Sequence, residues 1–414
     1  MATQKFTLNK PVLLKNRLVL SWAPRGFFRE SSFWVEYPDL TSLSLSQEKM
    51  TEAYFPVCVA LACLGDVEIE LPFAVPDGIL QNWERYLEAV SRACFRKKIR
   101  TVFKNGKEIS EPKREKGTET ALLFGGGAES LLVLSRLLKE GRKPVLVSAG
   151  GPGWAGSDPD QNPHKAQMDH RVSQDLGLKL LRVLTNFRDV IHERDWNAFV
   201  RPWHSLVNAA LLNPLLISLV APATGNFGIG KLVQGNEKMS RRSSEYFCFT
   251  PEAVRLLRNV ASDFEYDSYL EDLYKEEVCR ELYEVYPHMA RYQYSCWQNH
   301  RVRWCHQCES CLRYYVLLKL HGLDPSWVGM DESEIGKNKK RLVLSASKSE
   351  ESFPGEIWER LYKKRQAVHD PLAKYFLNEV RRTAWIYHRV YDPLPECVRE
   401  FLGVSRFLPS LKTS

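Results

Sequence analysis

The sequence contains no run of about twenty apolar residues, the length that a helix needs to span a membrane, so we expect no membrane-spanning segment. Its first residues, MATQKFTLNKPVLLKNRLVL, lack the apolar stretch and the small-residue cleavage site of a secretory signal. We therefore expect a cytoplasmic location and a reducing compartment. In such a compartment, cysteines at short spacing favour metal binding over disulfide bonds.

The sequence also lacks internal repeats, low-complexity tracts and a strong excess of charge. Its 58 Lys and Arg residues and 50 Asp and Glu residues give a net charge of +8. This charge suits a phosphorylated substrate, a nucleotide or a nucleic acid and selects none of them. Solvated loops explain the basic runs RKKIRTVFKNGK and GKNKKR better than nucleic-acid contacts do, although a nucleic-acid partner stays open.

The order of expected elements predicts an α/β fold. Residues 1–115 mix short β-like runs with two helical stretches, which indicates an N-terminal α+β region. In residues 116–250 short apolar strands alternate with helices, the pattern of βαβ units in a doubly wound parallel sheet. Residues 251–335 are expected to be mainly helical and to contain a cysteine cluster, and residues 336–414 to form a helical C-terminal extension.

Individual elements can be placed by residue range. The expected strands are 17–22, 32–37, 66–73, 120–124, 143–150, 178–187 and 231–235. The expected helices are 47–64, 75–95, 128–141, 164–177, 203–221 and 370–390. A polar linker, KNGKEISEPKREKGTET, separates the N-terminal region from the parallel strands.

Three contiguous glycines, Gly125, Gly126 and Gly127, follow the expected strand 120–124 in the stretch LLFGGGAES. Glycine permits positive φ and a close approach of the backbone to a ligand. The helix expected to follow, with Ser130 in its first turn, offers N–H groups and the positive end of its dipole to a phosphate. The loop is neither a Walker A sequence nor G-x-G-x-x-G, and a plain strand-to-helix turn stays an alternative.

Four of the ten cysteines, Cys296, Cys305, Cys308 and Cys311, lie within sixteen residues as C-x8-C-x2-C-x2-C. Two C-x2-C steps let three thiolates reach one ion, and four sulfurs complete a tetrahedral Zn²⁺ site with no open position. The pattern therefore predicts a structural zinc site, with an iron–sulfur cluster as the alternative. His306 lies between two of the cysteines and is more typical of a surface residue than of a ligand.

The glycine loop resembles the pyrophosphate-binding loop of the N-type ATP pyrophosphatases, the PP-loop superfamily. That loop usually reads Ser-Gly-Gly-x-Asp-Ser and follows the first strand of an adenine nucleotide alpha hydrolase-like sheet. Gly126, Gly127 and Ser130 match it, while Gly125 replaces the first serine and Glu129 replaces the aspartate. In the family the loop grips the β- and γ-phosphates of ATP while a substrate oxygen attacks the α-phosphate.

The segment Tyr294–Leu323 is similar to the zinc segment of the 7-cyano-7-deazaguanine synthases. The resemblance to the bacterial UDP-N-acetylmuramoyl-L-alanyl-L-glutamate epimerases is closer. Those proteins share a Gly-Gly-Gly-x-Asp-Ser loop, a run like Arg303–Cys305, an extra N-terminal region and an Asn-Glu-basic-x-Ser stretch, here Asn236–Ser240. The resemblance covers roughly residues 50–330, with identity confined to these motifs.

The resemblance implies an enzyme that uses ATP, Mg²⁺ and a structural Zn²⁺ to adenylate a carboxylate. The implied nucleotide-binding residues are Gly125, Gly126, Gly127, Glu129 and Ser130, and the implied catalytic residues are Glu237, Lys238 and Arg241. The expected partner is a small molecule or peptide conjugate with a carboxylate, namely the glutamyl residue of a UDP-muramoyl dipeptide, which would be epimerised. Three alternatives stay open: amide or nitrile formation on a deazapurine acid, tRNA modification, and a nucleotide-binding scaffold without catalysis.

Overall fold

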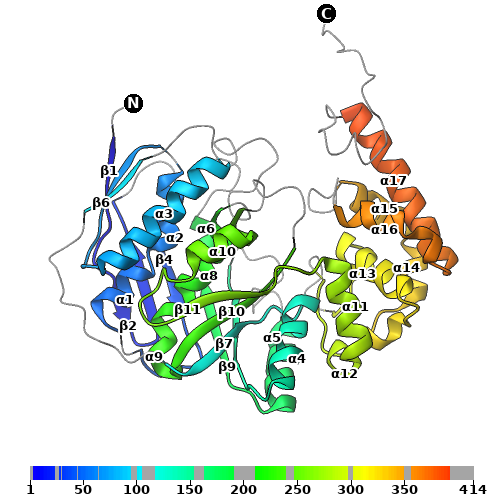
Figure 1. The fold of residues 1–414 in the computed structure, drawn as a ribbon, viewed down its shortest axis with the longest axis horizontal. Coiled ribbons are helices and arrows are strands. Elements are labelled where there is room, and N and C mark those ends of the chain that lie inside the picture. Colours follow the sequence, from blue (N-terminus) through cyan, green and yellow to red (C-terminus); the bar gives the residue numbers. More distant parts are fainter. Residues whose placement is uncertain are drawn as a thin grey trace, which may run out of the picture. The chain divides into compact units, whose positions relative to one another are not determined.

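The computed structural model describes residues 3–23, 28, 30–43, 45–63, 65–94, 100–104, 117–152, 163–190, 210–238, 247–296, 302–348 and 356–391. The chain divides into two compact units, Met1–Tyr274 (unit 1) and Lys275–Ser414 (unit 2), and each is described by itself (Figure 1). Among the described helices, none combines the length and apolar character that crossing a bilayer requires.

Unit 1 is built on an eight-stranded sheet with the order β11-β10-β7-β8-β9-β4-β3-β2. Its strands are β2 (Val12–Leu14), β3 (Arg17–Ser21), β4 (Ser32–Glu36), β7 (Glu119–Leu123), β8 (Val145–Gly150), β9 (Leu180–Thr185), β10 (Ile229–Glu237) and β11 (Glu265–Leu270). The strands from β11 to β9 are mutually parallel, and β4, β3 and β2 continue the sheet in antiparallel pairs. The predicted α/β class with parallel strands is confirmed.

Two features of this sheet differ from the sequence prediction. The expected boundary at residue 115 falls between strands of one sheet, because β4 pairs with β9 through Val35 and Thr185. The ion pair between Arg182 and Asp39, at 2.6 Å, supports the same junction. The segment after residue 250, expected to be mainly helical, contains β11, which pairs in parallel with β10. Both differences arise from pairings between residues far apart in the chain, which local patterns do not reveal.

A second sheet in unit 1 has three parallel strands in the order β1-β5-β6, with bounds β1 (Gln4–Thr7), β5 (Val67–Glu70) and β6 (Thr101–Lys104). The helices and 3₁₀ turns of unit 1 are α1 (Gln47–Glu52), α2 (Phe55–Ala62), α3 (Asp77–Cys94), α4 (Ala128–Lys139), α5 (Pro163–Leu176), α6 (Phe187–Val190), α8 (Leu212–Val220), η2 (Ala221–Ala223), α9 (Thr224–Phe227), η3 (Phe247–Phe249) and α10 (Pro251–Leu257). The helix expected at 47–64 is divided in two at Ala53–Tyr54, and Pro56 lies in the first turn of the second part.

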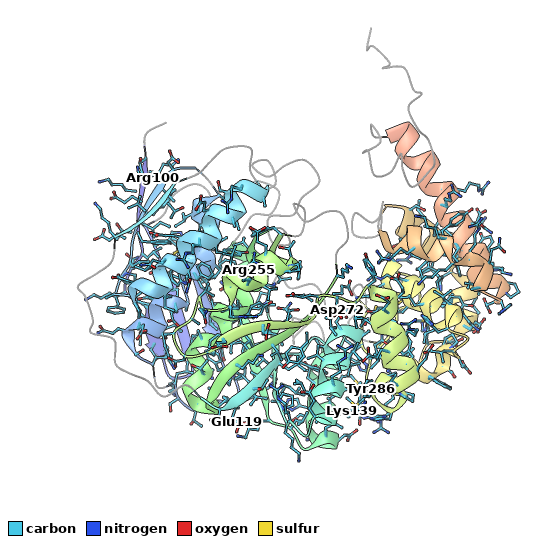
Figure 2. The ribbon with its side chains drawn as sticks, in the orientation of Figure 1. Arg100, Glu119, Lys139, Arg255, Asp272 and Tyr286 are labelled. Carbon is cyan, nitrogen blue, oxygen red and sulfur yellow. The ribbon has the colours of Figure 1, made fainter. Side chains whose placement is uncertain are left out.

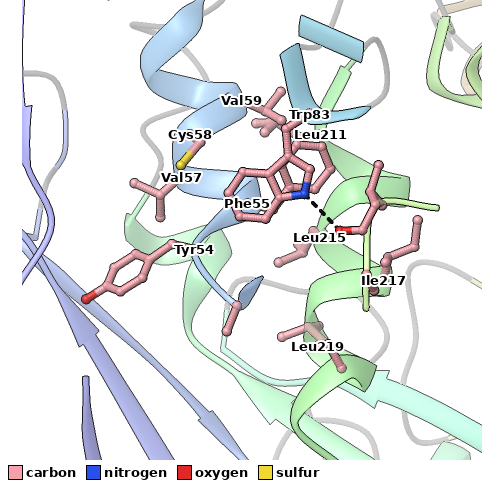
Figure 3. Close-up of a cluster of buried hydrophobic side chains, with 14 of the residues drawn as sticks. Tyr54, Phe55, Val57, Cys58, Val59, Trp83, Leu211, Leu215, Ile217 and Leu219 are labelled. Atoms are coloured by element: carbon pink, nitrogen blue, oxygen red, sulfur yellow. Dashed lines mark hydrogen bonds between the residues drawn. The ribbon is translucent and has the colours of Figure 1, made fainter. Parts of the chain in front are cut away.

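The core of unit 1 lies between the large sheet and the helices α2, α3, α8 and α10, while α4 and α5 cover the opposite face (Figure 1). α2 is buried along its whole length. Trp83 of α3 stacks on Phe55 with ring centroids 4.7 Å apart, and its indole N–H donates to the Val260 carbonyl at 2.8 Å (Figure 3). The buried indole thus satisfies its polar group while contributing a large apolar surface.

The parallel strands run in the same direction, so their amino ends lie at one end of the sheet and their carboxyl ends at the other. Glu119 begins β7 and Asp272 follows β11, and the two lie at opposite ends of the strands (Figure 2). The end of the sheet opposite to Glu119 therefore contains the carboxyl ends of all five parallel strands, β7 to β11.

The described part of unit 2 is helical. Its helices and 3₁₀ turns are α11 (Lys275–Val285), α12 (Pro287–Ala290), α13 (Glu309–Leu320), η4 (Pro325–Val328), α14 (Glu332–Lys337), α15 (Lys339–Lys348), α16 (Glu356–Lys363), η5 (Arg365–Ala367) and α17 (Pro371–Tyr391). The Tyr315 hydroxyl lies 2.9 Å from Glu332 Oε1 and 3.1 Å from Asp370 Oδ1, and Lys319 Nζ lies 2.7 Å from Glu332 Oε2. This network joins α13 to α14 and to the start of α17.

Candidate functional site

The strand order of unit 1 brings two predicted site segments to neighbouring strands. From β7 the chain adds β8 and β9 on one side of the sheet and then returns to add β10 and β11 on the other side. In open parallel sheets, ligands bind at the carboxyl ends of the strands where the order reverses. Here those strands are β7, which leads into Gly125–Gly127, and β10, which leads into Glu237 and Lys238.

The glycine loop has an open backbone above the first turn of α4. Gly126 has a φ of 72°, in the left-handed region that favours glycine. A Cβ atom at Gly125 would have no atom of the described residues within 4 Å. Gly127 is the N-cap of α4 and has no side chain to cap it, while the Ser130 hydroxyl donates to the Gly127 carbonyl at 3.1 Å. Such a turn leaves space for an anion close to the backbone.

Gly235 of β10 holds the two segments together. A Cβ atom built on Gly235 would lie 3.0 Å from the carbonyl carbon and oxygen of Glu129 and 3.1 Å from its Cβ. Only glycine allows β10 to approach the first turn of α4 so closely. The structure therefore places the predicted residues Glu129 and Ser130 beside the carboxyl end of β10.

The residues that follow Gly235 are held by β11 and by the turn after it. The Asn236 side chain is buried, and its Nδ2 donates to the Tyr266 hydroxyl at 3.0 Å. Glu237, the last residue of β10, is half-buried. The Lys238 N–H donates to the Leu273 carbonyl at 2.7 Å, and its ammonium lies 4.9 Å from the centre of the Tyr274 ring. The third predicted catalytic residue, Arg241, lies outside the described residues.

A buried cluster on β8 and α5 was not predicted from the sequence. Lys165 Nζ donates to Ser148 Oγ at 2.6 Å and to Asp169 Oδ2 at 2.7 Å, and Ser148 Oγ donates to the same carboxylate oxygen at 2.5 Å. All three side chains are buried. Because Leu123 of β7 pairs with Val147 of β8, the cluster is level with the start of the glycine loop. The sequence signal was a Lys–Asp pair four residues apart on the face of α5 that also carries apolar residues.

The four cysteines of unit 2 come together as predicted. Their sulfur atoms all lie within 4.8 Å of one another, with Cys305 and Cys311 at 3.7 Å and Cys308 and Cys311 at 3.5 Å. A tetrahedral zinc ion with sulfur ligands at about 2.3 Å would separate its sulfurs by about 3.8 Å. The group could therefore hold a metal ion such as zinc.

Local structure fixes the positions of these cysteines. Cys308 is the N-cap of α13, and its sulfur accepts the Cys311 N–H at 3.5 Å. The Gln307 N–H donates to the Cys305 sulfur at 3.4 Å. The residue before Cys296 is tied to α13, because its carbonyl accepts the Ser310 hydroxyl at 2.6 Å. N–H donors of this kind stabilise thiolates as metal ligands.

The electrostatics of the group also suit a cation. Hydrogen bonds with Cys296 raise the pKa values of Cys308 and Cys311 well above their usual range. The hydrogen bond with Cys296 also raises the pKa of Cys305. The hydrogen bonds that Cys305 accepts from Cys308 and Cys311 lower this pKa by more, so that the net value is about 7. Three of these cysteines are buried and Cys305 is half-buried, and four thiols at this separation cannot all ionise unless a cation replaces their shared protons.

His306 does not belong to the group. It has a φ of 56°, and its Nε2 accepts the Asp331 N–H at 2.9 Å. That nitrogen is therefore engaged with the backbone before α14, and the side chain, which the sequence favoured as a surface residue over a ligand, is half-buried. Trp304, the residue before Cys305, donates its indole N–H to the Val328 carbonyl at 2.6 Å.

Comparisons of this chain with family models, with curated proteins and with solved structures give no match.

Proposed function

We propose that this chain is an ATP-dependent, AMP-forming enzyme with a PP-loop fold that adenylates a substrate carboxylate. One structural observation gives the proposal its main support. The close approach of Gly235 to Glu129 places the glycine loop beside the Asn236–Lys238 segment, where the strand order reverses. The glycine loop, which resembles the PP-loop, and the segment that resembles the Asn-Glu-basic-x-Ser stretch of the epimerases thus lie at the same end of the sheet.

The glycine loop would hold the β- and γ-phosphates of ATP. Gly125, Gly126 and Gly127 would let the backbone approach the phosphates, and the N–H groups at the start of α4 would complement their charge. Ser130 would contribute its hydroxyl. Glu129, in the first turn of α4, would supply a carboxylate oxygen to Mg²⁺, which prefers oxygen ligands. Glu129 has a longer side chain than the aspartate of the family's loop but carries the same charge.

The carboxylate substrate would bind over the end of β10. Its oxygen would attack the α-phosphorus of ATP, and the bond from that phosphorus to pyrophosphate would break. Lys238 and Arg241 would offset the negative charge of the reacting groups, the arginine through paired N–H donors. Glu237 would orient the acid or the metal-bound nucleotide. These roles need cations and a carboxylate on one short segment, which GNEKMSRR provides.

Activation explains how such an enzyme would epimerise a glutamyl residue of a UDP-muramoyl dipeptide or a related peptide. The α-hydrogen beside a free carboxylate is barely acidic, because a carbanion there would face a full negative charge. Adenylation removes that charge, so a general base could take the proton and a proton from the opposite face would invert the centre. Water would then attack the acyl carbon, and AMP and the free acid would leave.

We further propose that zinc occupies the four-cysteine group. Cys296, Cys305, Cys308 and Cys311 would fill its four positions, so that no position is open for substrate. The ion would join the start of α13 to the segment that ends at Cys296 and would stabilise unit 2. The binding energy of such a site is folding energy.

The test supplies purified protein with ATP, Mg²⁺ and a UDP-muramoyl dipeptide ending in L-glutamate, in deuterated water. We expect release of AMP and pyrophosphate, inversion of the terminal α-carbon and deuterium at that carbon. Lys238 is exposed and would be covered by the bound acid, so Lys238→Ala should lower the rate by an amount equivalent to roughly 2–5 kcal/mol. Lys139→Ala, at the far end of α4, serves as the control and should leave the rate unchanged (Figure 2).

Other outcomes would assign another function. AMP release that needs ammonia and a deazapurine acid, with no exchange at a glutamyl centre, would indicate nitrile formation. AMP release that needs tRNA would indicate tRNA modification. ATP binding with no AMP release from any of these acids would indicate a nucleotide-binding protein without catalysis.

A further inference from the structure

A chain of side-chain hydrogen bonds runs along the carboxyl end of β10. Asn236 Nδ2 donates to the Tyr266 hydroxyl at 3.0 Å, and that hydroxyl donates to Gln234 Oε1 at 2.9 Å. Burial raises the pKa of Tyr266, so its hydroxyl keeps its single proton. Because that proton goes to Gln234, Tyr266 can only accept from Asn236. The Asn236 amide is therefore oriented with Nδ2 toward Tyr266.

This orientation leaves the other end of the Asn236 amide without a partner. Asn236 Oδ1 is buried and accepts no hydrogen bond from any residue that the structure describes. The residue as a whole is 2% exposed. A buried carbonyl oxygen in this state is costly and becomes favourable when a donor reaches it. A carbonyl oxygen accepts and cannot donate, so the group that satisfies it carries an N–H or an O–H.

The backbone of Asn236 is fixed beside the glycine loop. Its N–H donates to Ser268 Oγ at 3.3 Å, which ties it to β11. The preceding residue, Gly235, lies against Glu129 at the start of α4. A ligand that reaches Asn236 Oδ1 at the end of β10 is therefore close to the loop that would hold ATP. A preorganised acceptor at this position favours one orientation of the bound acid.

We propose that Asn236 Oδ1 accepts a hydrogen bond from an N–H of the acid substrate, so that the enzyme selects N-acyl amino acids. The inference rests on the proposed function, because it concerns the acid that is adenylated. In an N-acyl amino acid the amide N–H and the carboxylate are attached to the same carbon. The N–H can thus reach Asn236 while the carboxylate meets the α-phosphate. An acid without this N–H leaves the buried oxygen unsatisfied and is rejected.

The experiment compares two substrates that differ in one group. The first is UDP-muramoyl-L-alanyl-L-glutamate, and the second replaces L-glutamate by (S)-2-hydroxyglutarate, so that an ester oxygen stands where the N–H was. We measure kcat/KM for AMP release. The unchanged protein should use the peptide at least about tenfold better than the ester. Asn236→Leu should lower the rate with the peptide by about tenfold more than the rate with the ester and so bring the ratio close to one.

Asn213→Leu is the matched control. Asn213 of α8 is also fully buried, its Nδ2 donates to the Cys248 carbonyl at 2.5 Å, and its Oδ1 has no partner among the described residues. This change should lower stability and keep the ratio of the unchanged protein. The ratio of the unchanged protein needs no variant, so the inference is also tested if Asn236→Leu does not fold.

Three results would overturn the inference. The unchanged protein could use peptide and ester equally well, or Asn236→Leu could lower both rates by the same factor while AMP release continues. In both cases the proposed adenylation stands and only the role of Asn236 is lost. If the unchanged protein releases AMP with neither acid, or with a deazapurine acid alone, the proposed substrate and the inference fail together.

Discussion

Gly235 faces the backbone of Glu129 so closely that a methyl group added at Gly235 would lie 3.0 Å from the Glu129 carbonyl oxygen. We expect Gly235→Ala to push the first turn of α4 away by a few tenths of an ångström. Binding of a non-hydrolysable ATP analogue should weaken by about tenfold, because a displacement of ~1 Å can cost about 100-fold. Titration calorimetry measures the change. Gly78→Ala in α3, where a Cβ meets nothing within 4 Å, should leave the affinity unchanged.

The glycine loop can be tested with two glycines of similar backbone conformation. Gly126 has a φ of 72° and Gly141, just after α4, has a φ of 75°. Valine at either position is strained by roughly 1–3 kcal/mol, so both variants should lose similar stability. Only Gly126→Val should abolish binding of the ATP analogue. Equal affinities in the two variants would show that the loop is only a turn.

The four-cysteine group can be tested by metal analysis. We expect the unchanged protein to contain about one zinc ion per chain. Cys308→Ala should lose this ion and lower the unfolding free energy of unit 2 by about 3 kcal/mol or more. Cys279→Ala is the control, because Cys279 is fully buried in α11 and does not belong to the group. This variant should keep the metal, and its unfolding free energy should fall by about 1 kcal/mol. Iron with visible absorption would indicate a cluster instead, and the absence of both metals would refute the site.

The ion pair between Lys165 and Asp169 should be costly to break from one side. Both side chains are buried, so Lys165→Met or Asp169→Asn leaves a buried charge or donor uncompensated and should cost about 3–5 kcal/mol. Replacing both by apolar residues should cost less than either single change. Urea unfolding of the two singles and the double gives the coupling energy.

The same helix provides a control for this pair. Arg171 and Asp175 form an exposed pair at 3.6 Å, with the same spacing of four residues. Asp175→Asn should change the unfolding free energy by less than about 0.5 kcal/mol. If breaking the buried pair costs no more than this, Lys165 and Asp169 do not anchor α5 to β8.

Glu52 should make the stability of unit 1 depend on pH. Burial raises the pKa of its carboxyl to about 8, although the Ser262 N–H donates to it at 2.9 Å and lowers the pKa in part. The negative charges of Glu48 and of Asp263, which is paired with Lys49, contribute to this raised pKa. The folded chain therefore keeps the neutral carboxyl at a pH where the unfolded chain, with a pKa of about 4.5, has lost the proton.

The sign of this effect follows from proton linkage. The contribution of Glu52 is fully present below about pH 4.5 and is lost as the pH rises through about 8. Glu52→Gln should remove this fall, which is on the order of a few kcal/mol, and keep the acceptor for Ser262. Urea unfolding at several pH values measures it. Glu88→Gln, an exposed change in α3, should leave the pH profile unaltered, and an unaltered profile in Glu52→Gln would contradict the prediction.

Features set by local sequence could be predicted. The strand, the glycines and the helix around Gly126 follow one another within about twenty residues, and the C-x2-C steps place three sulfurs within one short turn. The approximate positions of α3, α4, α5 and β7 to β10 follow from the same kind of pattern. In each case the residues that decide the structure are neighbours in the chain.

Features set by distant contacts could not be predicted. β11 contains Glu265 and Asp267, which are rare in strands, and it forms because β10 offers it a parallel partner. The Lys165–Asp169 pair has the spacing of an ordinary surface pair on a helix, and only the position of Ser148 on β8 makes it a buried cluster. The pairing of β4 with β9 joins residues that are about 150 positions apart.

The pairing of β4 with β9 also decides where the sheet of unit 1 is open to other chains. β4 pairs with the last two residues of β9, Leu184 and Thr185, and the Asp39 carboxylate accepts the Arg182 N–H at 3.1 Å. Unpaired strand edges recruit strands from other copies of a protein. Beyond β4 the sheet continues to β2, an edge strand of three residues. A shorter edge offers fewer groups for unwanted pairing. The strands β4, β3 and β2 thus shorten the edge on this side of the sheet, while β11 is the edge strand on the other side.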